Sequence, residues 1–346
     1  MDEPLSVAIV GSGWVSCNRH LPALARNPDV NITGMVAQAE SLELVDRKLL
    51  SRYGITTTST NFDSEVIGRA DAVMIGTPPT THKELVLEAL RLGKHVLVEK
   101  PMTLSVEDAD HLVDAARSSG KTLAVVHNLN FCRSAQRARQ LLESGKLGEL
   151  RAVLGLQSSN HLRRLPKWYP ELPLGLFTDE AAHLIYLMQS FLPGASLKTL
   201  DVGPALSSSD NTPDAVSMVF RSTDGRPGTL HMSFVGAISE WALILQGDRR
   251  TAVIDLFRDI LIVVNNDRRH LSHQVLMTSA RTISDHLVGV ITSGALMASH
   301  RLDYGNSEVV RRFVKSVNSG DDPQQISAFD GRAVVSVISA AHDARL

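Results

Sequence analysis

The sequence predicts an α/β protein with two domains: a doubly wound parallel sheet, then an α+β domain with an open, mostly antiparallel sheet. Its 346 residues exceed the ~100–200 residues of a typical single domain. Up to residue 127, short apolar runs alternate with helix-like segments, which is typical of a parallel sheet with helices on both faces. Beyond it, strand-like runs follow one another between turn signals. We therefore expect domains at 1–127 and 128–346, with C-terminal helices that could pack back on the first.

The first domain contains five apolar runs that read as strands and four segments that read as helices. The strands are expected at 6–10, 30–37, 72–76, 95–99 and 122–126, and the helices at 15–26, 42–53, 80–93 and 105–120. The third helix has Thr80 or Thr81 as its N-cap and ends at Gly93. The fourth opens with Ser105 and Asp108, a variant of the capping box, and stops at Gly120.

The second domain begins with helix-like segments and continues with strands. Helices are expected at 133–144, 178–192, 306–319 and 329–343, and strand-like runs between 197 and 264. The segment "TDGRPG" (223–228) predicts a hairpin turn. No element is assigned to residues 265–300.

Composition and net charge argue against several classes of binding partner and cellular location. The net charge is −2, so no basic field is available for nucleic acid or an anionic membrane. Two cysteines suit a reducing compartment. The N-terminus "MDEPLSVAIV" is acidic and enters a strand at once, so we expect no signal peptide, and the longest weakly polar run, 287–298, falls short of a membrane span. We expect a cytoplasmic protein.

Two glycines follow the first strand directly, in "VAIVGSGWVSCNRHLPAL". In a dinucleotide-binding turn, the first glycine makes the tight turn and the second lets the backbone approach a pyrophosphate at the helix N-terminus. The third glycine of that pattern is replaced by Ser16. The alternative is a tight turn without a ligand. The residues expected to bind the cofactor here are Gly11, Ser12, Gly13, Trp14 and Val15.

The residue that would read the adenine ribose lies at the end of the second strand, where the sequence has Gln38. An acidic residue would accept a hydrogen bond from the ribose 2′-hydroxyl and repel a 2′-phosphate, whereas glutamine repels nothing. Glu40 could take the acidic role, and basic residues follow on the next helix. The cofactor is therefore NAD or NADP, and the pattern favours NAD.

The strand 95–99 delivers Glu99-Lys100-Pro101 at its carboxyl end, which is where open parallel sheets bind ligands. Pro101 disfavours helical geometry at the residue before it and so keeps Lys100 extended. A partly buried ammonium near a cationic nicotinamide would have a lowered pKa and could exchange a proton with a substrate oxygen. The alternative is a solvated lysine after a strand.

Four segments together resemble the Gfo/Idh/MocA oxidoreductases, namely the glycine segment, "AVMIGTPPTTHKELVLEALRLGKHVLVEKPMTLSVEDADHLVDAA", "HNLNF" and "GKLGEL". The resemblance implies a Rossmann domain and a C-terminal domain for substrate and oligomerisation, in a homodimer or homotetramer. It implies that Lys100 contacts the reacting oxygen. It also implies a cofactor site that includes Thr77, Pro78, Pro79, His82, Glu99, Lys100 and Asn128.

Asp179 and His183 stand four residues apart in a predicted helix, so they share one face. Such pairs are common on helix surfaces, and alone they would indicate nothing. The family carries Asp-x-x-x-His at this point, which implies that His183, or Lys100, moves the hydroxyl proton and that Asp179 orients the histidine or holds a neighbouring hydroxyl. Two segments depart from the family: one glycine, Gly175, stands where a glycine-rich run is frequent, and "HNLNF" (127–131) replaces an Asn-Arg-Arg-Phe-like pattern.

The loop 160–170 contains Arg163, Arg164, Lys167, Trp168 and Tyr169. A sugar stacks on an aromatic face and arginine holds a carboxylate or phosphate, so Arg163 and Trp168 are candidate substrate contacts. The alternative is a solvated basic loop. We expect no metal site, because the remaining histidines lack ligand spacing. These are His20, His95, His111, His161, His231, His270, His273 and His300.

The function expected from this resemblance is NAD(P)-dependent hydride transfer between nicotinamide and a hydroxyl or carbonyl carbon of a sugar, cyclitol or sugar derivative. One alternative is an NAD-dependent glycoside hydrolase of the same fold that oxidises its substrate transiently. Another is a sensor or scaffold that binds the cofactor without catalysis, although Lys100, Asp179 and His183 would be superfluous in it.

Overall fold

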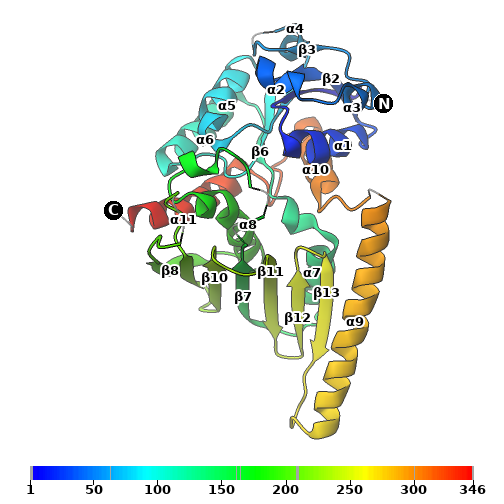
Figure 1. Ribbon diagram of the computed structural model, residues 1–346, viewed down its shortest axis with the longest axis vertical. Helices are drawn as coiled ribbons and strands as arrows, with labels where there is room; N and C mark the ends of the chain where they lie inside the picture. Colours follow the sequence, from blue (N-terminus) through cyan, green and yellow to red (C-terminus); the bar gives the residue numbers. More distant parts are fainter. Residues whose placement is uncertain are drawn as a thin grey trace. The chain divides into compact units, whose positions relative to one another are not determined.

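The structure is a computed structural model that describes residues 3–62, 64–160, 162–163, 165–207, 210–299 and 301–344. His161, Arg164 and His300, which the sequence analysis considered, lie outside the described residues. The chain forms two compact units: Met1–Asn128 with Asn306–Ser339, and Leu129–Gly305 with Ala340–Leu346 (Figure 1). The stretch 306–339 thus belongs to the first unit.

The first unit contains a six-stranded parallel sheet in the order β3-β2-β1-β4-β5-β6. This confirms the predicted doubly wound sheet. Its central strands are buried on both faces, as β4 (AVMI) is at every position, because helices cover both sides. The strands are β1 (Leu5–Val10), β2 (Val30–Val36), β3 (Thr58–Ser59), β4 (Ala72–Ile75), β5 (His95–Val98) and β6 (Leu123–Val125).

The helices of this unit follow the local signals in most places. They are η1 (Ser16–His20), α1 (Leu21–Ala25), α2 (Ala39–Glu43), α3 (Arg47–Arg52), α4 (Glu65–Gly68), η2 (Pro79–Thr81), α5 (His82–Arg91), α6 (Val106–Ser119), α10 (Asn306–Ser319) and α11 (Ala328–Asp343), whose residues from Ala340 on belong to the second unit. Ser105 caps α6 by accepting a hydrogen bond from the Asp108 amide, and Gly120 ends it at φ 65°, as predicted.

One predicted helix of the first unit is wrong. The sequence indicated a continuous helix at 42–53, but the structure has two short helices, α2 and α3. Asp46 accepts a hydrogen bond from the Lys48 amide and starts α3 anew. Leu44, in the break, is 87% exposed, so no apolar contact holds the two helices as one.

The second unit contains a seven-stranded sheet in the order β13-β12-β11-β7-β10-β9-β8. β7 and β10 pair in parallel and the other neighbours are antiparallel, which confirms the mostly antiparallel prediction. The strands are β7 (Leu150–Ser158), β8 (Ser196–Val202), β9 (Ala215–Arg221), β10 (Pro227–Ser233), β11 (Glu240–Gly247), β12 (Arg250–Asp255) and β13 (Ile260–Asn265). The predicted turn at 223–228 joins β9 to β10.

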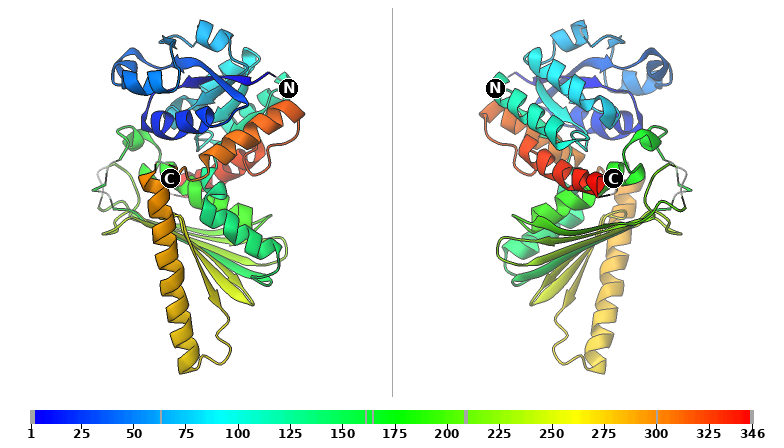
Figure 2. Two further views of the ribbon diagram at one scale, coloured as in Figure 1. Left: turned by 90° about the vertical axis from the view of Figure 1, so that its right-hand side faces the viewer. Right: turned by 90° about the vertical axis from the view of Figure 1, so that its left-hand side faces the viewer.

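Helices pack on this sheet from both sides. Its helical segments are η3 (Asn128–Phe131), α7 (Arg133–Glu143), η4 (Tyr169–Glu171), α8 (Leu176–Phe191) and α9 (Ser272–Ala298). The buried helix α8 packs on β7 and β10, while α7 packs on β12 and β13. The 27-residue helix α9 fills the stretch for which the sequence predicted no element, and Figure 2 shows it on the side of the sheet opposite to α7.

Candidate active site

The glycine turn after β1 is the tightest part of the first unit. Gly11 has φ 98°, and a Cβ there would lie 2.8 Å from the Gly76 carbonyl oxygen. The Gly11 amide donates to the Val36 carbonyl at 2.7 Å, and the Gly76 amide donates to the Val10 carbonyl. The ends of β1, β2 and β4 are therefore tied together at this turn, and glycine is required at its first position.

Ser16 stands where the dinucleotide pattern has its third glycine. Its side chain is fully buried, and its hydroxyl donates to the Gly76 carbonyl at 3.2 Å. A Cβ on Gly76 would lie 2.4 Å from Ser16 Oγ. Gly76, which follows β4, has no side chain and therefore lets the helix approach the strand closely. This explains why a serine can replace the third glycine of the pattern.

The turn fits a dinucleotide pyrophosphate. No atom of the described residues lies within 4 Å of a Cβ built on Gly13, so the backbone is open to a ligand. The Ser12 hydroxyl oxygen is buried and has no hydrogen-bond partner within the described part of the chain. The backbone is helical from Trp14 to Ala25, and Trp14 and Val15 are 51% and 39% exposed at its start. Unpaired amides at such a start favour an anion.

Gln38 lies where the ribose reader was expected. It lies two residues after the end of β2, is exposed, and acts as the N-cap of α2, whose Ser41 and Leu42 amides donate to the Gln38 carbonyl. Its side chain is therefore available beside the glycine turn, since the Val36 carbonyl contacts Gly11.

The segment after β4 is held from beneath by His82. This side chain is fully buried, with Nδ1 2.9 Å from the Pro101 carbonyl oxygen and Nε2 3.0 Å from that of Thr77. Burial lowers the pKa of His82, and the two carbonyls oppose that shift. His82 was predicted to line the cofactor, but both ring nitrogens are engaged by backbone. We interpret it as a residue that positions the Thr77 and Pro101 segments; Pro78 is half-buried and Pro79 buried.

Glu99 and Lys100 follow β5, whose end lies beside that of β4, because the Glu99 amide donates to the Ile75 carbonyl. Glu99 Oε1 lies 2.9 Å from Nε2 of the buried His20, in the geometry of an ion pair rather than of a linear hydrogen bond. Glu99 Oε2 accepts from the Lys100 amide at 2.9 Å. Lys100 is half-buried, and the Lys100–Pro101 peptide is cis. His20, considered merely structural in the sequence, fixes the carboxylate next to this lysine.

All these cofactor candidates in the first unit lie at one edge of its sheet. Gly11 follows β1, Gln38 follows β2, Thr77 follows β4 and Lys100 follows β5, and these strands are parallel neighbours. The carboxyl edge of an open parallel sheet is where ligands bind. Asn128, half-buried, closes the unit after β6.

In the second unit, α8 carries both predicted catalytic residues. Asp179 is 9% exposed, and His183 is half-buried one turn later. The His183 Nδ1 atom lies 2.8 Å from the Tyr186 hydroxyl oxygen, and that oxygen accepts a hydrogen bond from the Leu129 amide at 3.0 Å. Tyr186 therefore holds the histidine ring from its Nδ1 side. Tyr186 was not predicted from the sequence, although its position three residues after His183 placed it on the same face.

Trp241 on β11 is a second neighbour of His183 that the sequence did not indicate. The two ring centroids lie 5.3 Å apart, and Phe257 packs 5.2 Å from Trp241 on its other side. The Trp241 Nε1 atom is buried and lacks a hydrogen-bond partner in the described parts of the chain. A buried indole N–H usually has an acceptor, so this donor suits a polar ligand next to His183.

Arg163 differs from its predicted role. Its guanidinium forms an ion pair with Glu180, the buried residue that follows Asp179. Gln157 Nε2 and Ser159 Oγ donate to the other Glu180 oxygen at 2.6 and 2.9 Å. Burial lowers the pKa of the Arg163 guanidinium. Arg163 therefore neutralises a buried carboxylate. This role differs from both expectations, which were a substrate contact and a residue of a solvated basic loop.

Trp168 is half-buried at the start of η4. The neighbouring Tyr169 donates to Asp210, a hydrogen bond that raises the pKa of Tyr169 to about 12.

Gly175 is the N-cap of α8 at φ 49°, and a Cβ there would lie 2.3 Å from Thr212 Oγ1. A single glycine is therefore enough to set the start of the helix that carries Asp179.

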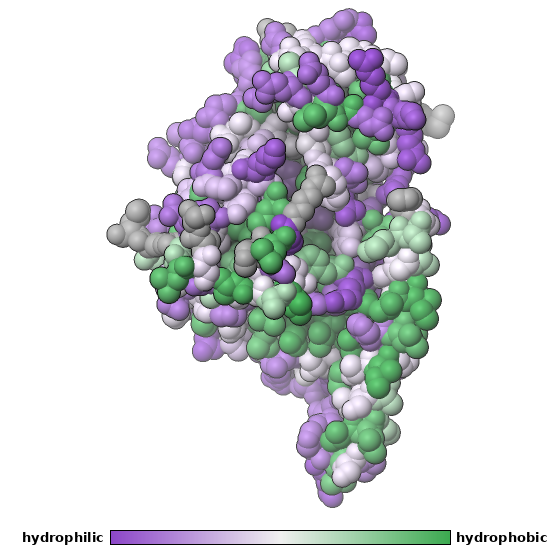
Figure 3. Space-filling model, in the orientation of Figure 1, coloured by the Kyte–Doolittle hydropathy of each residue, from purple (hydrophilic) through white to green (hydrophobic). Residues whose placement is uncertain are grey.

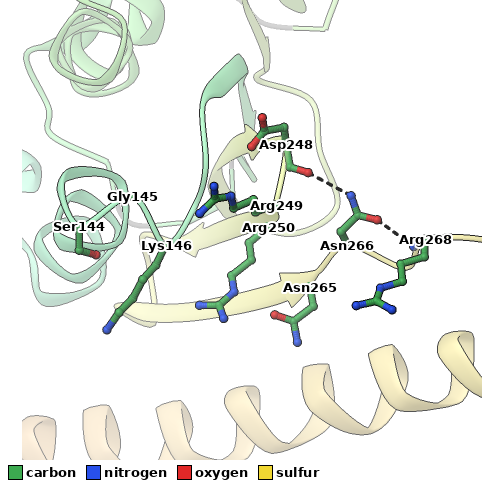
Figure 4. A pocket seen from close by; sticks show the side chains of 9 residues that line it. All are labelled: Ser144, Gly145, Lys146, Asp248, Arg249, Arg250, Asn265, Asn266 and Arg268. Atoms are coloured by element: carbon green, nitrogen blue, oxygen red, sulfur yellow. Dashed lines mark hydrogen bonds between the residues drawn. The ribbon is translucent and has the colours of Figure 1, made fainter.

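A separate cavity of about 610 Å³ lies in the second unit at the β11–β12 turn (Figure 4). It contains none of the predicted site residues. Its lining is mostly exposed and includes four basic residues, Lys146, Arg249, Arg250 and Arg268; the others are Ser144, Gly145, Asp248, Asn265 and Asn266.

The described residues include neither a metal-binding cluster nor a helix that could span a membrane. No group of three His, Cys, Asp or Glu side chains there is placed to hold a metal ion. No helix in the described ranges combines the length and the apolar character needed to cross a membrane.

Comparison with protein families decides the identity of the two units. Residues 5–127 match the oxidoreductase family with an NAD-binding Rossmann fold, and residues 135–253 match the GFO/IDH/MocA C-terminal domain. The chain belongs to the Gfo/Idh/MocA family. Together the two matches cover more than half of it, and they confirm the resemblance that the sequence motifs indicated.

Relatives of this Gfo/Idh/MocA protein include sugar enzymes. D-Glucoside 3-dehydrogenase of Escherichia coli is 30% identical over 181 residues, which is 51% of this chain and 48% of the relative. The chain spans about half, or less, of the first three curated relatives that it matches.

Solved structures share the fold over the whole chain. GenD2 from gentamicin A biosynthesis, in complex with NAD, has a TM-score of 0.77 at 21% identity, covering 99% of this chain and 94% of that one. KijD10, a 3-ketoreductase from Actinomadura kijaniata in complex with NADP and TDP-benzene, has a TM-score of 0.74 at 18% identity, covering 99% and 98%. At these identities the likeness shows the fold alone.

Proposed function

We propose that the protein is an NAD(P)-dependent oxidoreductase that transfers a hydride between nicotinamide and a hydroxyl or carbonyl carbon of a sugar, cyclitol or sugar derivative. The observation that carries the proposal is the carboxyl edge of the first sheet. There an open glycine turn with an unpartnered buried hydroxyl and a half-buried lysine belong to one parallel sheet. Gln38 lacks a cationic neighbour directly after it, which favours NAD over NADP.

Each catalytic role follows from the chemistry of one side chain. The bound nicotinamide supplies the hydride acceptor or donor. Lys100 donates a hydrogen bond to the reacting oxygen and stabilises negative charge there. His183 Nε2 accepts the hydroxyl proton in oxidation or supplies it in reduction, and Asp179 orients the substrate or the imidazole.

The contact with Tyr186 allows His183 to act as a base in oxidation and as an acid in reduction. When His183 Nδ1–H donates to the Tyr186 oxygen, Nε2 carries a lone pair and serves as a base. When Tyr186 donates its proton to Nδ1 instead, Nε2 carries a proton and serves as an acid. The hydroxyl can take either part while it accepts from Leu129, because it has two lone pairs and one proton.

The substrate class is supported by relatives and by side chains. D-Glucoside 3-dehydrogenase is named for a sugar substrate, and the structure of the 3-ketoreductase KijD10 contains TDP-benzene, a nucleotide derivative. In this chain, the half-buried Trp168 and the unpartnered indole N–H of Trp241 offer a stacking face and a donor. Arg163 is engaged with Glu180, so we assign it to the support of α8.

The test is a Lys100→Met variant compared with Lys315→Met, which removes an exposed lysine from α10. NAD and NADP reduction is followed at 340 nm with a panel of polyols, uronic acids, amino sugars and sugar nucleotides, and dinucleotide binding by calorimetry. We expect Lys100→Met to retain dinucleotide binding and to lose roughly 10²–10⁴-fold in turnover. Unchanged turnover would refute the role of Lys100.

The same assay separates the alternatives. A hydrolase that oxidises its substrate transiently would release a cleaved sugar without net change at 340 nm. A sensor would bind dinucleotide and turn over no member of the panel. A Lys100→Met, His183→Ala double variant should lose much less than the product of the single losses, because residues that serve one step are not additive.

A further inference from the structure

The helix α9 turns its small and polar residues toward its own unit. Asp285 Oδ2 accepts from the amide of Val263 on the edge strand β13 at 3.0 Å, and Ser293 Oγ donates to the Asp259 carbonyl at 3.2 Å. A Cβ on Gly289 would lie 2.4 Å from an Ile260 methyl carbon. The less exposed positions of the helix are Gln274, Thr278, Thr282, Asp285, Gly289, Ser293 and Leu296.

Large apolar side chains lie on the outward face of α9. Apart from Val288, seven of them are between 44% and 70% exposed: Leu276, Met277, Ile283, Leu287, Val290, Ile291 and Met297. Figure 3 shows apolar surface along this helix. A helix of a globular protein normally has the opposite arrangement, with its apolar stripe inward. An outward apolar stripe of this size indicates a contact surface.

The outward residues also follow a heptad pattern. Leu276, Ala280, Ile283, Leu287, Val290, Gly294 and Met297 are separated alternately by four and three residues, which is the a/d spacing of a helix that packs against another helix. Ala280 and Gly294 are exposed, and nothing in the described chain lies within 4 Å of a Cβ on Gly294. These seven positions, which we call the seam, span three heptads and include no charged residue. Arg281 lies outside the seam and is paired with Asp285.

We propose that α9 pairs through this seam with α9 of a second copy of the chain. The spacing selects a helix as the occupant, and the seam supplies a matching helix in every copy, so a two-fold contact is self-complementary. A fully exposed aliphatic side chain has about 100 Å² of accessible surface. At their exposed fractions, the seven apolar residues therefore present roughly 400 Å² per copy. Two copies therefore cover about 800 Å² before the small seam residues are counted, close to the ~1,000 Å² of a specific interface.

The test is the mass of the full chain in solution, measured by light scattering. Leu287→Glu places a charge at the centre of the seam, and it should halve the number of copies in the assembly. Val288→Glu is the matched control: Val288 is 56% exposed on the same helix but points about 100° away. It should leave the mass unchanged. Circular dichroism and dinucleotide binding should stay as in the unmodified protein for both variants, because neither residue is buried.

Cross-linking gives a second readout. Leu287→Cys should form a disulfide-linked dimer under oxidant, whereas the unmodified chain should not, since Cys17 and Cys132 are buried. A monomeric unmodified protein, or an unchanged mass for Leu287→Glu, would overturn the proposal. A monomer that instead sediments with phosphatidylcholine vesicles would assign the stripe to a membrane surface and overturn it too.

Discussion

Replacing Gly11 with alanine is expected to destabilise the first unit by about 1–5 kcal/mol. The backbone at Gly11 has φ 98°, and a left-handed conformation costs an L-residue roughly 1–2 kcal/mol. The new Cβ would lie 2.8 Å from the Gly76 carbonyl oxygen, and overpacking of this kind costs about 1–3 kcal/mol. The lower entropy of the unfolded chain offsets about 0.4–1 kcal/mol of the total.

Gly13→Ala is the matched variant, because it should impair binding without affecting folding. Gly13 has no left-handed φ, and a Cβ there meets no atom of the described residues within 4 Å. Its stability should change by less than about 1 kcal/mol. The methyl group would occupy the space through which the pyrophosphate approaches the backbone, so NAD affinity should fall roughly tenfold or more.

The assay combines urea unfolding followed by circular dichroism with NAD titration by calorimetry. Gly11→Ala should move the unfolding midpoint, and Gly13→Ala should move the dissociation constant. If Gly13→Ala bound NAD as tightly as the unmodified protein, the dinucleotide would not lie on this turn. If Gly11→Ala unfolded at the unmodified midpoint, the contact with Gly76 would not constrain the fold.

Three further outcomes can be checked on the same preparations. Tyr186→Phe leaves the Leu129 amide without its acceptor and His183 Nδ1 without a partner, so we expect a loss of about 1–3 kcal/mol in stability and a shifted pH profile of turnover; an unchanged profile would contradict the role of Tyr186. Burial lowers the pKa of His127 from 6.5 to about 4, so protonation favours the unfolded state. The stability that this neutral histidine contributes is complete above pH 6.5 and is lost as pH falls toward 4, by roughly 3 kcal/mol, and His127→Gln should remove that part of the pH dependence of urea unfolding. Gln38→Asp should raise the preference for NAD over NADP by roughly tenfold in dissociation constants, and an unchanged ratio would place the ribose elsewhere.

Local signals were read correctly where a short segment decides its own conformation. Ser105 and Gly120 bound α6 because a side-chain cap and a left-handed glycine act within a few residues. The apolar stripe at 306–319 gave α10 in full, with Val309 and Phe313 buried. The predicted helix at 42–53 failed because a cap at Asp46 competes with continuation, and propensity alone does not decide that competition.

Long-range partners were beyond the reach of the sequence. Arg163 and Glu180 are 17 positions apart, and only the placement of the loop against α8 shows that they neutralise each other. His20 reaches Glu99 because β1 and β5 lie on either side of β4 in one sheet. The helix α9 escaped prediction because its apolar residues face away from its own unit, so its pattern matched no expected core face.

By itself, the sequence determined the two-sheet architecture, the family, the glycine turn and the chemical types of the candidate catalytic residues. The architecture and the glycine turn depend on spacing and periodicity, which the chain carries locally, whereas the family was indicated by motifs that resemble those of its members. Tertiary structure decided which nitrogen of His183 contacts Tyr186, which carboxylate pairs with Arg163 and which face of α9 is exposed. Each of these depends on groups far apart in the chain, whose distances arise only when strands and helices pack.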